Sequence, residues 1–280
     1  MQQITDNVFV ETTTRGCNYG FVRTSAGVVL IDSPFSIAGA AELRDTLAGY
    51  GELRYTILTE PHPDHWFGHA LFDAPMVANA GSRKGVETFD LTELSERYGW
   101  PASYRPRLPD VTFSERLTLY VGDHTFELIT MPGHTPYQTT VVVREESVAF
   151  TTDNLFNRVH TWLQEADPER WLDSLEAIRA LDQTTLVPGH GAVCDNDYLD
   201  EQAAWLGEWE QLVRDGIAAG LDKAEIEQQA LTEMLPRFPM DVGLDARAPS
   251  VMRANVANLY DFVRREGIHA PQAGSPASAP

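Results

Sequence analysis

Short runs of β-branched and apolar residues alternate along the chain with longer amphipathic segments, a pattern that predicts a mixed α/β fold. Three strand-like runs lie within residues 8–33 and are separated by turns that contain glycine, so we expect a β-meander there. A helix is predicted over 37–50, because its apolar residues recur at helical spacing, Ser36 can cap its start and Gly51 can end it.

The strongest helix signal in the chain covers residues 167–181. Asp167 can cap the start of this helix, and Pro168 suits its first turn. The apolar positions that form a stripe along one side are Trp171, Leu172, Leu175, Ile178 and Leu181. Such a stripe is more often core packing than a ligand site, so we assign it to the core. A shorter helix is expected over 90–98.

The C-terminal part of the chain is predicted to be helical. Helical spacing continues from 198 to 231 with a break near Gly220, and a last helix is expected over about 251–265. We expect these helices to form a lid or a surface for homodimerisation. The predicted parts of the chain are a main domain at 1–196, a helical extension at 197–268 and a disordered tail at 269–280.

Four of the predicted strands end at side chains that can bind a metal ion. The strands and the side chains that follow them are 55–59 with Glu60, His62, Asp64 and His65, 126–131 with His134, 147–152 with Asp153, and 184–187 with His190. Strand ends in layered α/β folds are rigid platforms from which loops present functional groups. A polar turn with satisfied histidines would explain any one of these clusters, but the repetition at four strand ends favours a shared metal site.

The same residues resemble a family signature. The metallo-β-lactamase-fold hydrolase superfamily carries His-x-His-x-Asp-His, then Gly-His, then an aspartate after a strand, then a second Gly-His. This chain reads Glu60-Pro-His62-Pro-Asp64-His65, Gly133-His134, Asp153 and Gly189-His190 over roughly its first two hundred residues. The resemblance implies an αββα four-layer sandwich with a C-terminal helical extension, in which 1–196 is the catalytic domain. One position departs from the signature, because Glu60 stands where the family usually has its first histidine.

The resemblance also implies a pair of divalent cations, zinc above all, that share a hydroxide. The implied ligands are Glu60, His62 and His134 for one cation, Asp64, His65 and His190 for the other, and Asp153 as the bridge between them. Two cations held in this way lower the pKa of the shared water from about 15.7 towards about 7, so that it can attack an electrophilic carbon or phosphorus. The implied activity is hydrolysis of a small ester, lactone, thioester or amide, with Asp64 and Glu60 as the catalytic candidates.

Two more residues are expected to support the ligands from behind. Asp32 follows the strand-like run at 28–31 and resembles the family's structural aspartate, which supports the metal loop by hydrogen bonds. His69 lies about one helical turn after His65 and is a candidate for the same role.

Glu60 changes the charge of the implied site. With a histidine at that position, two dications, two carboxylates and one hydroxide leave one positive charge, whereas an ionised Glu60 leaves none. A neutral cluster tolerates iron or manganese better, and Glu60, His62 and His134 have the composition of a two-histidine, one-carboxylate site for ferrous oxygen chemistry. The alternatives are therefore an iron-dependent oxidoreductase or dioxygenase on the same fold, and Glu60 as a general base off the metal. The complete set of downstream ligands disfavours a third alternative, a non-catalytic metal-binding protein.

The charge of the chain limits the classes of binding partner that we expect. The formal net charge is -20, and Lys84 and Lys223 are the only lysines, which argues against nucleic acid and anionic membrane surfaces as partners. No apolar run approaches the about 20 residues that span a bilayer, and residues 1–7 lack the basic start and apolar core of a signal peptide. Cys17 and Cys194 do not form a disulfide framework. We therefore expect a cytoplasmic protein that acts on a small molecule.

Overall fold

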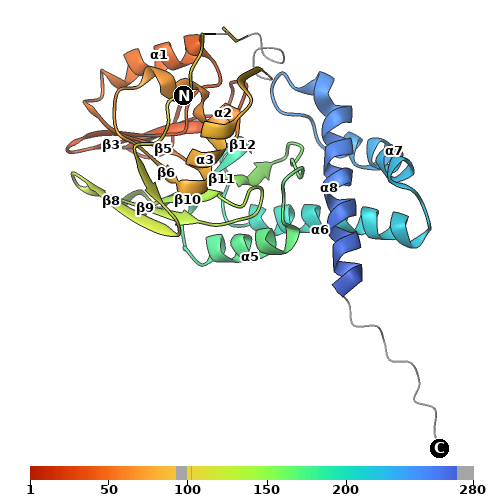
Figure 1. Cartoon of the computed structure of the whole chain (residues 1–280). Coiled ribbons are helices and arrows are strands. Elements are labelled where there is room, and N and C mark those ends of the chain that lie inside the picture. The colour runs from red at the N-terminus through yellow and green to blue at the C-terminus, as the bar shows by residue number, and fades with distance from the viewer. Residues whose placement is uncertain (93–99, 102, 270–280) are drawn as a thin grey trace, which may run out of the picture.

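The four-layer sandwich implied by the resemblance is confirmed by the computed structural model, which describes residues 1–92, 100–101 and 103–269. Two β-sheets lie face to face, and helices cover the outer face of each sheet (Figure 1). The C-terminal helices form a further group beside the second sheet (Figure 1).

The N-terminal sheet has its strands in chain order. They are β1 (Gln2–Gln3), β2 (Val8–Glu11), β3 (Tyr19–Thr24), β4 (Gly27–Ile31), β5 (Leu53–Leu58), β6 (Met76–Asn79) and β7 (Val111–Phe113). Neighbours from β1 to β4 are antiparallel, which confirms the predicted meander, and neighbours from β4 to β7 are parallel. The helices between the parallel strands are α1 (Ile37–Leu47), α2 (Pro63–Trp66) and α3 (Ala80–Thr88), with the 3-10 turn η1 (Phe67–Leu71) after α2. Ser36 caps α1 as predicted, because its side chain accepts a hydrogen bond from the backbone N–H of Gly39.

The second sheet has the strand order β12-β11-β10-β9-β8. Its strands are β8 (Arg116–Val121), β9 (His124–Thr130), β10 (Thr139–Val143), β11 (Val148–Asn157) and β12 (Thr185–Gly191), with η2 (Arg144–Glu146) between β10 and β11. Neighbours are antiparallel except β11 and β12, which run parallel. Parallel neighbours need a crossover connection, and α5 (Pro168–Arg179) lies in it. Residues at the same ends of β11 and β12 are thereby brought side by side.

The alternation of side chains along β3 and β4 shows how one sheet packs against the second sheet on one face and against a helix on the other. Val22 and Val29 belong to the core between the two sheets. Their neighbours Phe21 and Leu30 point the other way and pack with Leu43 of α1. Successive side chains of a strand point to opposite faces of a sheet, so strands covered on both faces need apolar residues throughout.

The helix predicted over 167–181 is α5, and Asp167 caps it by accepting a hydrogen bond from the backbone N–H of Arg170. The buried members of its predicted stripe are Trp171, Leu175 and Ile178. Leu172, by contrast, is 38% exposed. It follows Trp171 by one residue, about 100° around the helix, and so points away from the core. The predicted stripe is wrong at that position.

The predicted C-terminal helices are confirmed, including the break at Gly220. They are α6 (Tyr198–Ala218), α7 (Lys223–Glu233) and α8 (Ala248–His269), with the 3-10 turns η3 (Leu235–Arg237) and η4 (Asp245–Arg247) between α7 and α8. One hydrophobic cluster runs from Leu186 of β12 through Trp171 and Trp209 to Met252 of α8. The C-terminal helices therefore pack on the sandwich, while the domain boundary at 196 stays a prediction.

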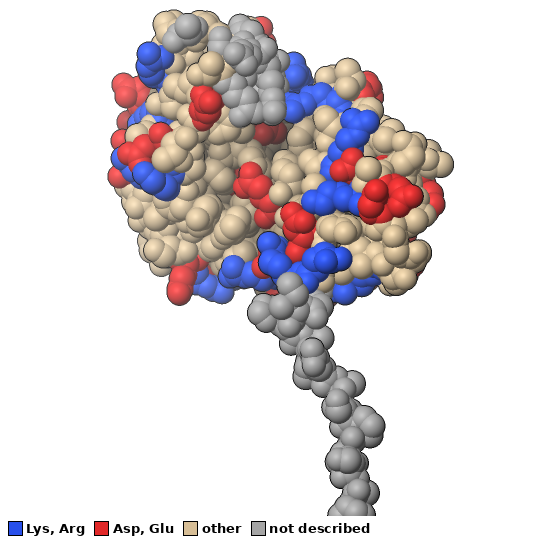
Figure 2. All heavy atoms as spheres, turned by 45° about the vertical axis from the view of Figure 1, so that its right-hand side comes forward, with Lys and Arg blue, Asp and Glu red and all other residues tan. Residues whose placement is uncertain are grey.

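Two predicted segments fall mostly outside the described residues, namely the helix over 90–98 and the tail over 269–280. Among the helices within the described ranges, none combines the length and the apolar composition that crossing a membrane requires. On the face shown in Figure 2, acidic and basic side chains are interspersed around a large uncharged area. The cytoplasmic location stays a prediction.

Candidate metal centre

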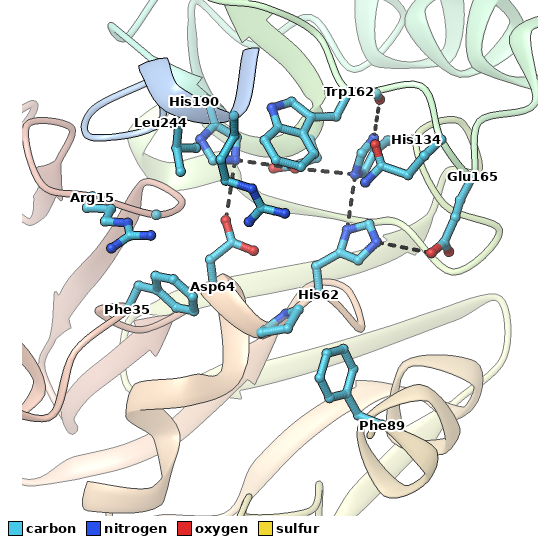
Figure 3. A pocket seen from close by; sticks show the side chains of 15 residues that line it. Arg15, Phe35, His62, Asp64, Phe89, His134, Trp162, Glu165, His190 and Leu244 are labelled. Atoms are coloured by element: carbon cyan, nitrogen blue, oxygen red, sulfur yellow. Dashed lines mark hydrogen bonds and ion pairs between the residues drawn. The ribbon is translucent and has the colours of Figure 1, made fainter. Parts of the chain in front are cut away.

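All the predicted ligands come together at one end of the sandwich, in two sets. In the first set, ligand atoms of Glu60, His62 and His134 lie within 4.8 Å of one another. In the second set, ligand atoms of Asp64, His65 and His190 do so. In Figure 3, His62 and Asp64 come from the start of α2, His134 and His190 come from two other segments, and all four side chains point toward a common centre. The two sets are the groupings that the family resemblance implied.

Asp153 lies between the two sets. Its Oδ2 atom is 3.5 Å from Nε2 of His134 in the first set and 3.5 Å from Nε2 of His190 in the second set. Its Oδ1 atom is 3.2 Å from Nε2 of His65, also in the second set. The carboxylate therefore faces ligand atoms of both sets, as a bridging ligand does.

Each histidine of the two sets turns one ring nitrogen to the centre and the other to an outer partner. The outer contacts are Nδ1 of His65 with Asp32 Oδ2 at 2.9 Å, Nδ1 of His134 with the Trp162 carbonyl oxygen at 2.8 Å, Nδ1 of His190 with Asp241 Oδ2 at 2.8 Å, and Nε2 of His62 with Glu165 Oε1 at 3.5 Å. Histidines that bind metals almost always donate their remote N–H to a carboxylate, a carbonyl or water. Such partners fix the tautomer and the direction of the ring.

Two buried ligand atoms at the centre lack a hydrogen-bond partner within the described part of the chain, and a metal ion could take that place. His65 Nε2 and Asp153 Oδ1 are buried and make no hydrogen bond among the described residues, although they lie 3.2 Å apart. A buried polar atom without a partner costs on the order of 1–3 kcal/mol. Imidazole nitrogen and carboxylate oxygen are donors that zinc and related cations accept, so the residues present fit a divalent metal ion.

The low pKa values of Asp153 and Glu60 keep both carboxylates ionised near neutral pH. Burial raises the pKa of Asp153, but His190 and His65 outweigh it and hold the pKa well below its usual range. Burial also raises the pKa of Glu60, whereas the neighbouring histidines, His62 above all, bring it down to about 2 against the repulsion of Asp153. Buried carboxylate charge of this kind needs a positive partner. The neighbouring histidines supply it here, and a bound cation would take their place.

The backbone at Thr152 is strained where it delivers Asp153. Thr152 has φ of 49°, a left-handed conformation that β-branched residues rarely adopt. The pairing of β11 with β12 shifts register on both sides of Thr152. The predicted strand end at 152 is therefore wrong, because β11 continues to Asn157 with an irregularity at this point. Strain of this kind gathers at functional sites, and here it turns the Asp153 side chain toward the centre.

The close approach of β11 explains the glycine that precedes His190. A Cβ atom on Gly189 would lie 1.7 Å from Oδ1 of Asp153 and 2.7 Å from the Asp153 backbone nitrogen. A Cβ atom on Gly133 would meet the Asn154 side-chain oxygen at 2.5 Å. Each Gly-His pair thus needs glycine because a neighbouring group passes too close for any side chain.

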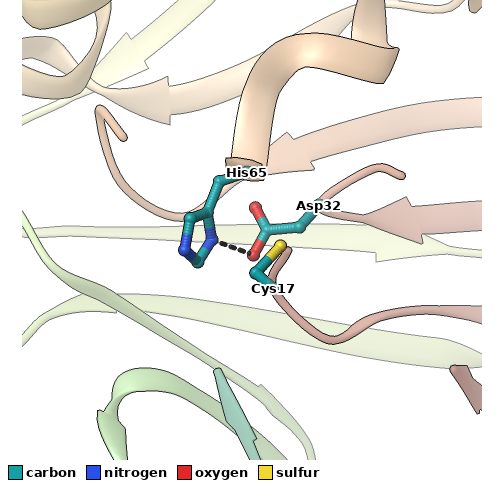
Figure 4. A group of neighbouring side chains, drawn as sticks. All are labelled: Cys17, Asp32 and His65. Carbon is teal, nitrogen blue, oxygen red and sulfur yellow. Dashed lines mark hydrogen bonds and ion pairs between the residues drawn. The ribbon is translucent and has the colours of Figure 1, made fainter. Parts of the chain in front are cut away.

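Cys17, Asp32 and His65 form a third group with ligand atoms within 4.8 Å of one another (Figure 4). Asp32 is fully buried and accepts hydrogen bonds from Nδ1 of His65 at 2.9 Å and from the backbone N–H of Thr59 at 3.0 Å. Burial raises the pKa of the Cys17 thiol well above its usual value, which keeps it protonated. This group therefore supports His65, and the predicted role of Asp32 is confirmed.

His69 does not take the supporting role, so that expectation is wrong. The side chain is fully buried, and neither ring nitrogen has a hydrogen-bond partner among the described residues. Burial, with Arg107 and His65 nearby, lowers the pKa of His69 to about 3. The ring is therefore neutral near pH 7 and belongs to the core.

We expect the variant His69→Leu to resist acid better than the wild type. The unfolded chain binds more protons than the folded one between about pH 6.5 and about pH 3, so stability is lost as the pH falls through that window. At about pH 5 the loss due to His69 is on the order of 2 kcal/mol. Urea unfolding with a chelator present, compared at about pH 7.5 and about pH 5, measures it. Equal losses in the two proteins would contradict the assignment.

Four partners of the centre lie outside the motifs, namely the Trp162 carbonyl beside His134 and the side chains of Gln138 beside Glu60, Glu165 beside His62 and Asp241 beside His190. Asp241 stands 51 residues from His190 along the chain, in the segment before η4. No periodicity or spacing marks it, because its contact depends on how the C-terminal helices pack on the second sheet.

Replacing Asp241 with asparagine is expected to weaken metal binding by roughly 10–100-fold, the usual result of losing an outer partner of a ligand. An asparagine amide oxygen can accept a hydrogen bond from Nδ1 of His190, but it lacks the negative charge by which a carboxylate makes the ring a stronger donor to a cation. Competition against a chromophoric chelator measures the affinity, and Asp245→Asn, at an exposed position at the start of η4, is the matched control. Equal affinities of the two variants would rule out a role for Asp241.

A cavity of about 290 Å³ opens over the centre (Figure 3) and is close to the lower size of ligand pockets, about 300 Å³. Ligand side chains that line it are His62, Asp64, His134, Asp153 and His190. Apolar side chains that line it are Phe35, Phe89, Trp162 and Leu244. Arg15 and Arg247 line it as well. Its size and lining suit a small molecule with an apolar part.

Comparisons with known proteins agree with this geometry. The family model described as the metallo-beta-lactamase superfamily matches residues 12–190. A hydroxyacylglutathione hydrolase from Acidiphilium cryptum is 26% identical over 247 residues, which cover 88% of this chain and 89% of that protein. A beta-lactamase-like protein 2 homolog from Caenorhabditis elegans is 25% identical over 190 residues, or 65% of this chain and 58% of that protein.

Solved structures share the fold at low sequence identity. A metallo-beta-lactamase family protein from Thermus thermophilus superposes with a TM-score of 0.70 at 16% identity, over 95% of each chain. A metallo-beta-lactamase from Pontibacter korlensis superposes with a TM-score of 0.61 at 19% identity, over 74% of this chain and 97% of its own. At such identities the likeness concerns the fold alone.

Proposed function

Since the chain belongs to the metallo-beta-lactamase superfamily and is a metal-dependent hydrolase, we propose that it cleaves a small ester, lactone, thioester or amide with two divalent cations. The observation that supports this most is the gathering of the two ligand sets around Asp153. Zinc is the first cation to test, because histidine-rich sites with carboxylates suit it. The hydroxyacylglutathione hydrolase among the relatives makes a thioester the first substrate to test.

When bound, a pair of cations supplies hydroxide near neutral pH and polarises the acceptor oxygen of the substrate. The chain's own residues orient the ligands, bind the substrate and handle the proton of the attacking water. The outer partners hold the ligand rings in place, and the apolar walls of the cavity bind the substrate and exclude bulk water. Asp64 lines the cavity and is proposed to orient the attacking water and to hold its proton on the carboxylate. Glu60 is fully buried, which favours a ligand over a general base that moves off the metal.

Metal analysis joined to an activity panel tests the proposal. Protein purified without added metal is expected to contain zinc, with two ions per chain when saturated. It should hydrolyse at least one member of a panel made of a thioester, a lactone, a nitrophenyl ester and an anilide. A chelator should abolish this activity, and added zinc should restore it. Hydrolysis that survives complete removal of metal would contradict the proposal.

The second candidate function is an iron-dependent oxidoreductase on the same fold. The observation that favours it is the first set, in which Glu60, His62 and His134 form a two-histidine, one-carboxylate group of the kind that holds ferrous iron in oxygenases. Loading with ferrous iron under nitrogen, followed by measurement of oxygen uptake with the substrates of the panel, separates the two functions. Oxygen uptake without hydrolysis would favour the oxidoreductase.

The helical extension over 197–268 is proposed to cover the site as a lid. Leu244 and Arg247 line the cavity, and Asp241 contacts His190, so the extension supplies part of the site. Homodimerisation through these helices stays a prediction, which light scattering over a range of protein concentrations tests.

A further inference from the structure

Glu60, the residue that departs from the family signature, is backed by Gln138. Both side chains are completely buried. With its amide nitrogen toward Glu60, Gln138 donates a hydrogen bond to Oε2 over 2.9 Å. Its amide oxygen accepts from the backbone N–H of Asp153 over 3.2 Å and from the Thr152 hydroxyl. The opposite orientation sets the amide oxygen against acceptors alone and the amide nitrogen against donors alone, so hydrogen bonding decides the assignment.

The two oxygens of Glu60 have different surroundings. Oε2 is held by Gln138 and lies 3.9 Å from Nε2 of His134. Oε1 lies 3.1 Å from Nδ1 of His62 in the first set and 2.8 Å from Nε2 of His65 in the second set. Two donor atoms on one zinc-like ion, each about 2.0–2.1 Å from it, are roughly 2.8–3.4 Å apart. Oε1 therefore stands at the spacing of a fellow ligand from one member of each set.

We propose that Glu60 is a second bridging carboxylate, which contacts both cations through Oε1 while Gln138 holds Oε2 away from them. This inference rests on the dinuclear site of the proposed function. Asp153 also faces both sets, but through different oxygens, with Oδ2 3.5 Å from Nε2 of His134 and Oδ1 3.2 Å from Nε2 of His65.

Gln138 is then a positioning residue. One amide contacts the side chain of Glu60 and the backbone of Asp153, so it sets the spacing between the two bridging carboxylates. A centre with two carboxylate bridges offers more hard oxygen donors than a histidine-rich one, and it suits Mn²⁺ or Fe²⁺ as well as Zn²⁺.

Stepwise metal binding distinguishes a bridge from a ligand of one set. Metal-free protein is titrated with Mn²⁺ or Zn²⁺ against a chromophoric chelator, and the two binding steps are fitted. Glu60→Gln keeps the shape of the side chain but removes its charge, so both steps are expected to weaken, each by more than roughly 10-fold. Asp64→Asn is the matched control, because Asp64 contacts His190 of its own set, and it should weaken one step.

The coupling between two bound Mn²⁺ ions tests the role of Gln138. Gln138→Met removes the amide at nearly constant length. We expect a loss of affinity of roughly 10–100-fold and a larger share of uncoupled Mn²⁺ in the electron paramagnetic resonance spectrum. Gln183→Met is the control, because Gln183 is another buried glutamine but its amide donates to the Leu181 carbonyl, and it should change neither quantity. Matching circular dichroism spectra show that both variants fold.

The possible failures are distinct. If Glu60→Gln weakens one step only, as Asp64→Asn does, Glu60 serves one cation and the bridge is disproved. If Gln138→Met leaves both affinity and coupling unchanged, Gln138 does not position Glu60. A wild-type protein that binds one ion or none contradicts the dinuclear site itself, which is the failure of the proposed function.

Discussion

Replacing Asp153 with asparagine is expected to lower the affinity for the cation pair by more than about 100-fold, beyond the effect of losing an outer partner. Hydrolysis should be lost with it. Oδ2 of Asp153 lies 3.5 Å from both His134 and His190, so its charge is shared between the two sets. Asparagine keeps the shape but has no charge, and it turns an amide nitrogen, which cannot bind a cation, toward one set.

Metal content after dialysis and turnover of the thioester measure this prediction. Asp173→Asn, at an exposed position on α5, is the control for the loss of one negative charge and should behave as the wild type. A variant Asp153→Asn that kept both ions and its activity would remove Asp153 from the centre.

The members of the two ligand sets could be predicted because each lies near the end of a strand that the pattern of apolar residues reveals. The predicted strand end at 187 is wrong, however, because β12 continues to Gly191 and contains His190. His62 directly precedes α2, and Asp64 and His65 lie in its single turn, a few residues after β5, and His134 follows the predicted strand that became β9. Segments that follow neighbouring strands of one sheet lie at the same edge of that sheet. Residues far apart in the sequence are therefore close in space. That two sheets pack face to face is predicted from the family resemblance, because no local pattern in the sequence indicates it.

The contacts that tune the ligands could not be predicted, because they join segments far apart in the chain. Asp241 reaches His190 only because the C-terminal helices pack on the second sheet. Gln138 reaches Glu60 only because the two sheets bring β5 and β10 together at their ends. The continuation of β11 past Asp153 depends in turn on the left-handed Thr152. Propensity would place Thr152 in ordinary strand geometry.

Substituting alanine for Gly189 is expected to be one of the most damaging single changes in the protein. The new Cβ would lie 1.7 Å from Oδ1 of Asp153 and 2.7 Å from the Asp153 backbone nitrogen. A side-chain rotation alone cannot relieve the clash with the backbone, so β11 and β12 must separate. Overpacking of this kind costs roughly 2–3 kcal/mol of stability, and the displaced Asp153 should lower metal affinity by more than about 100-fold.

Gly207→Ala is the matched control for this prediction. A Cβ on Gly207 meets nothing within 4 Å, and the residue lies inside α6, where alanine is favoured over glycine by about 1 kcal/mol. Exchange of glycine for alanine is thus expected to stabilise α6 at position 207 and to disrupt the Gly-His pair at position 189. Thermal and urea unfolding of metal-free protein separate the effect on stability from the loss of metal. If Gly189→Ala unfolded like Gly207→Ala and bound metal like the wild type, the close approach of β11 to His190 would not hold the centre together.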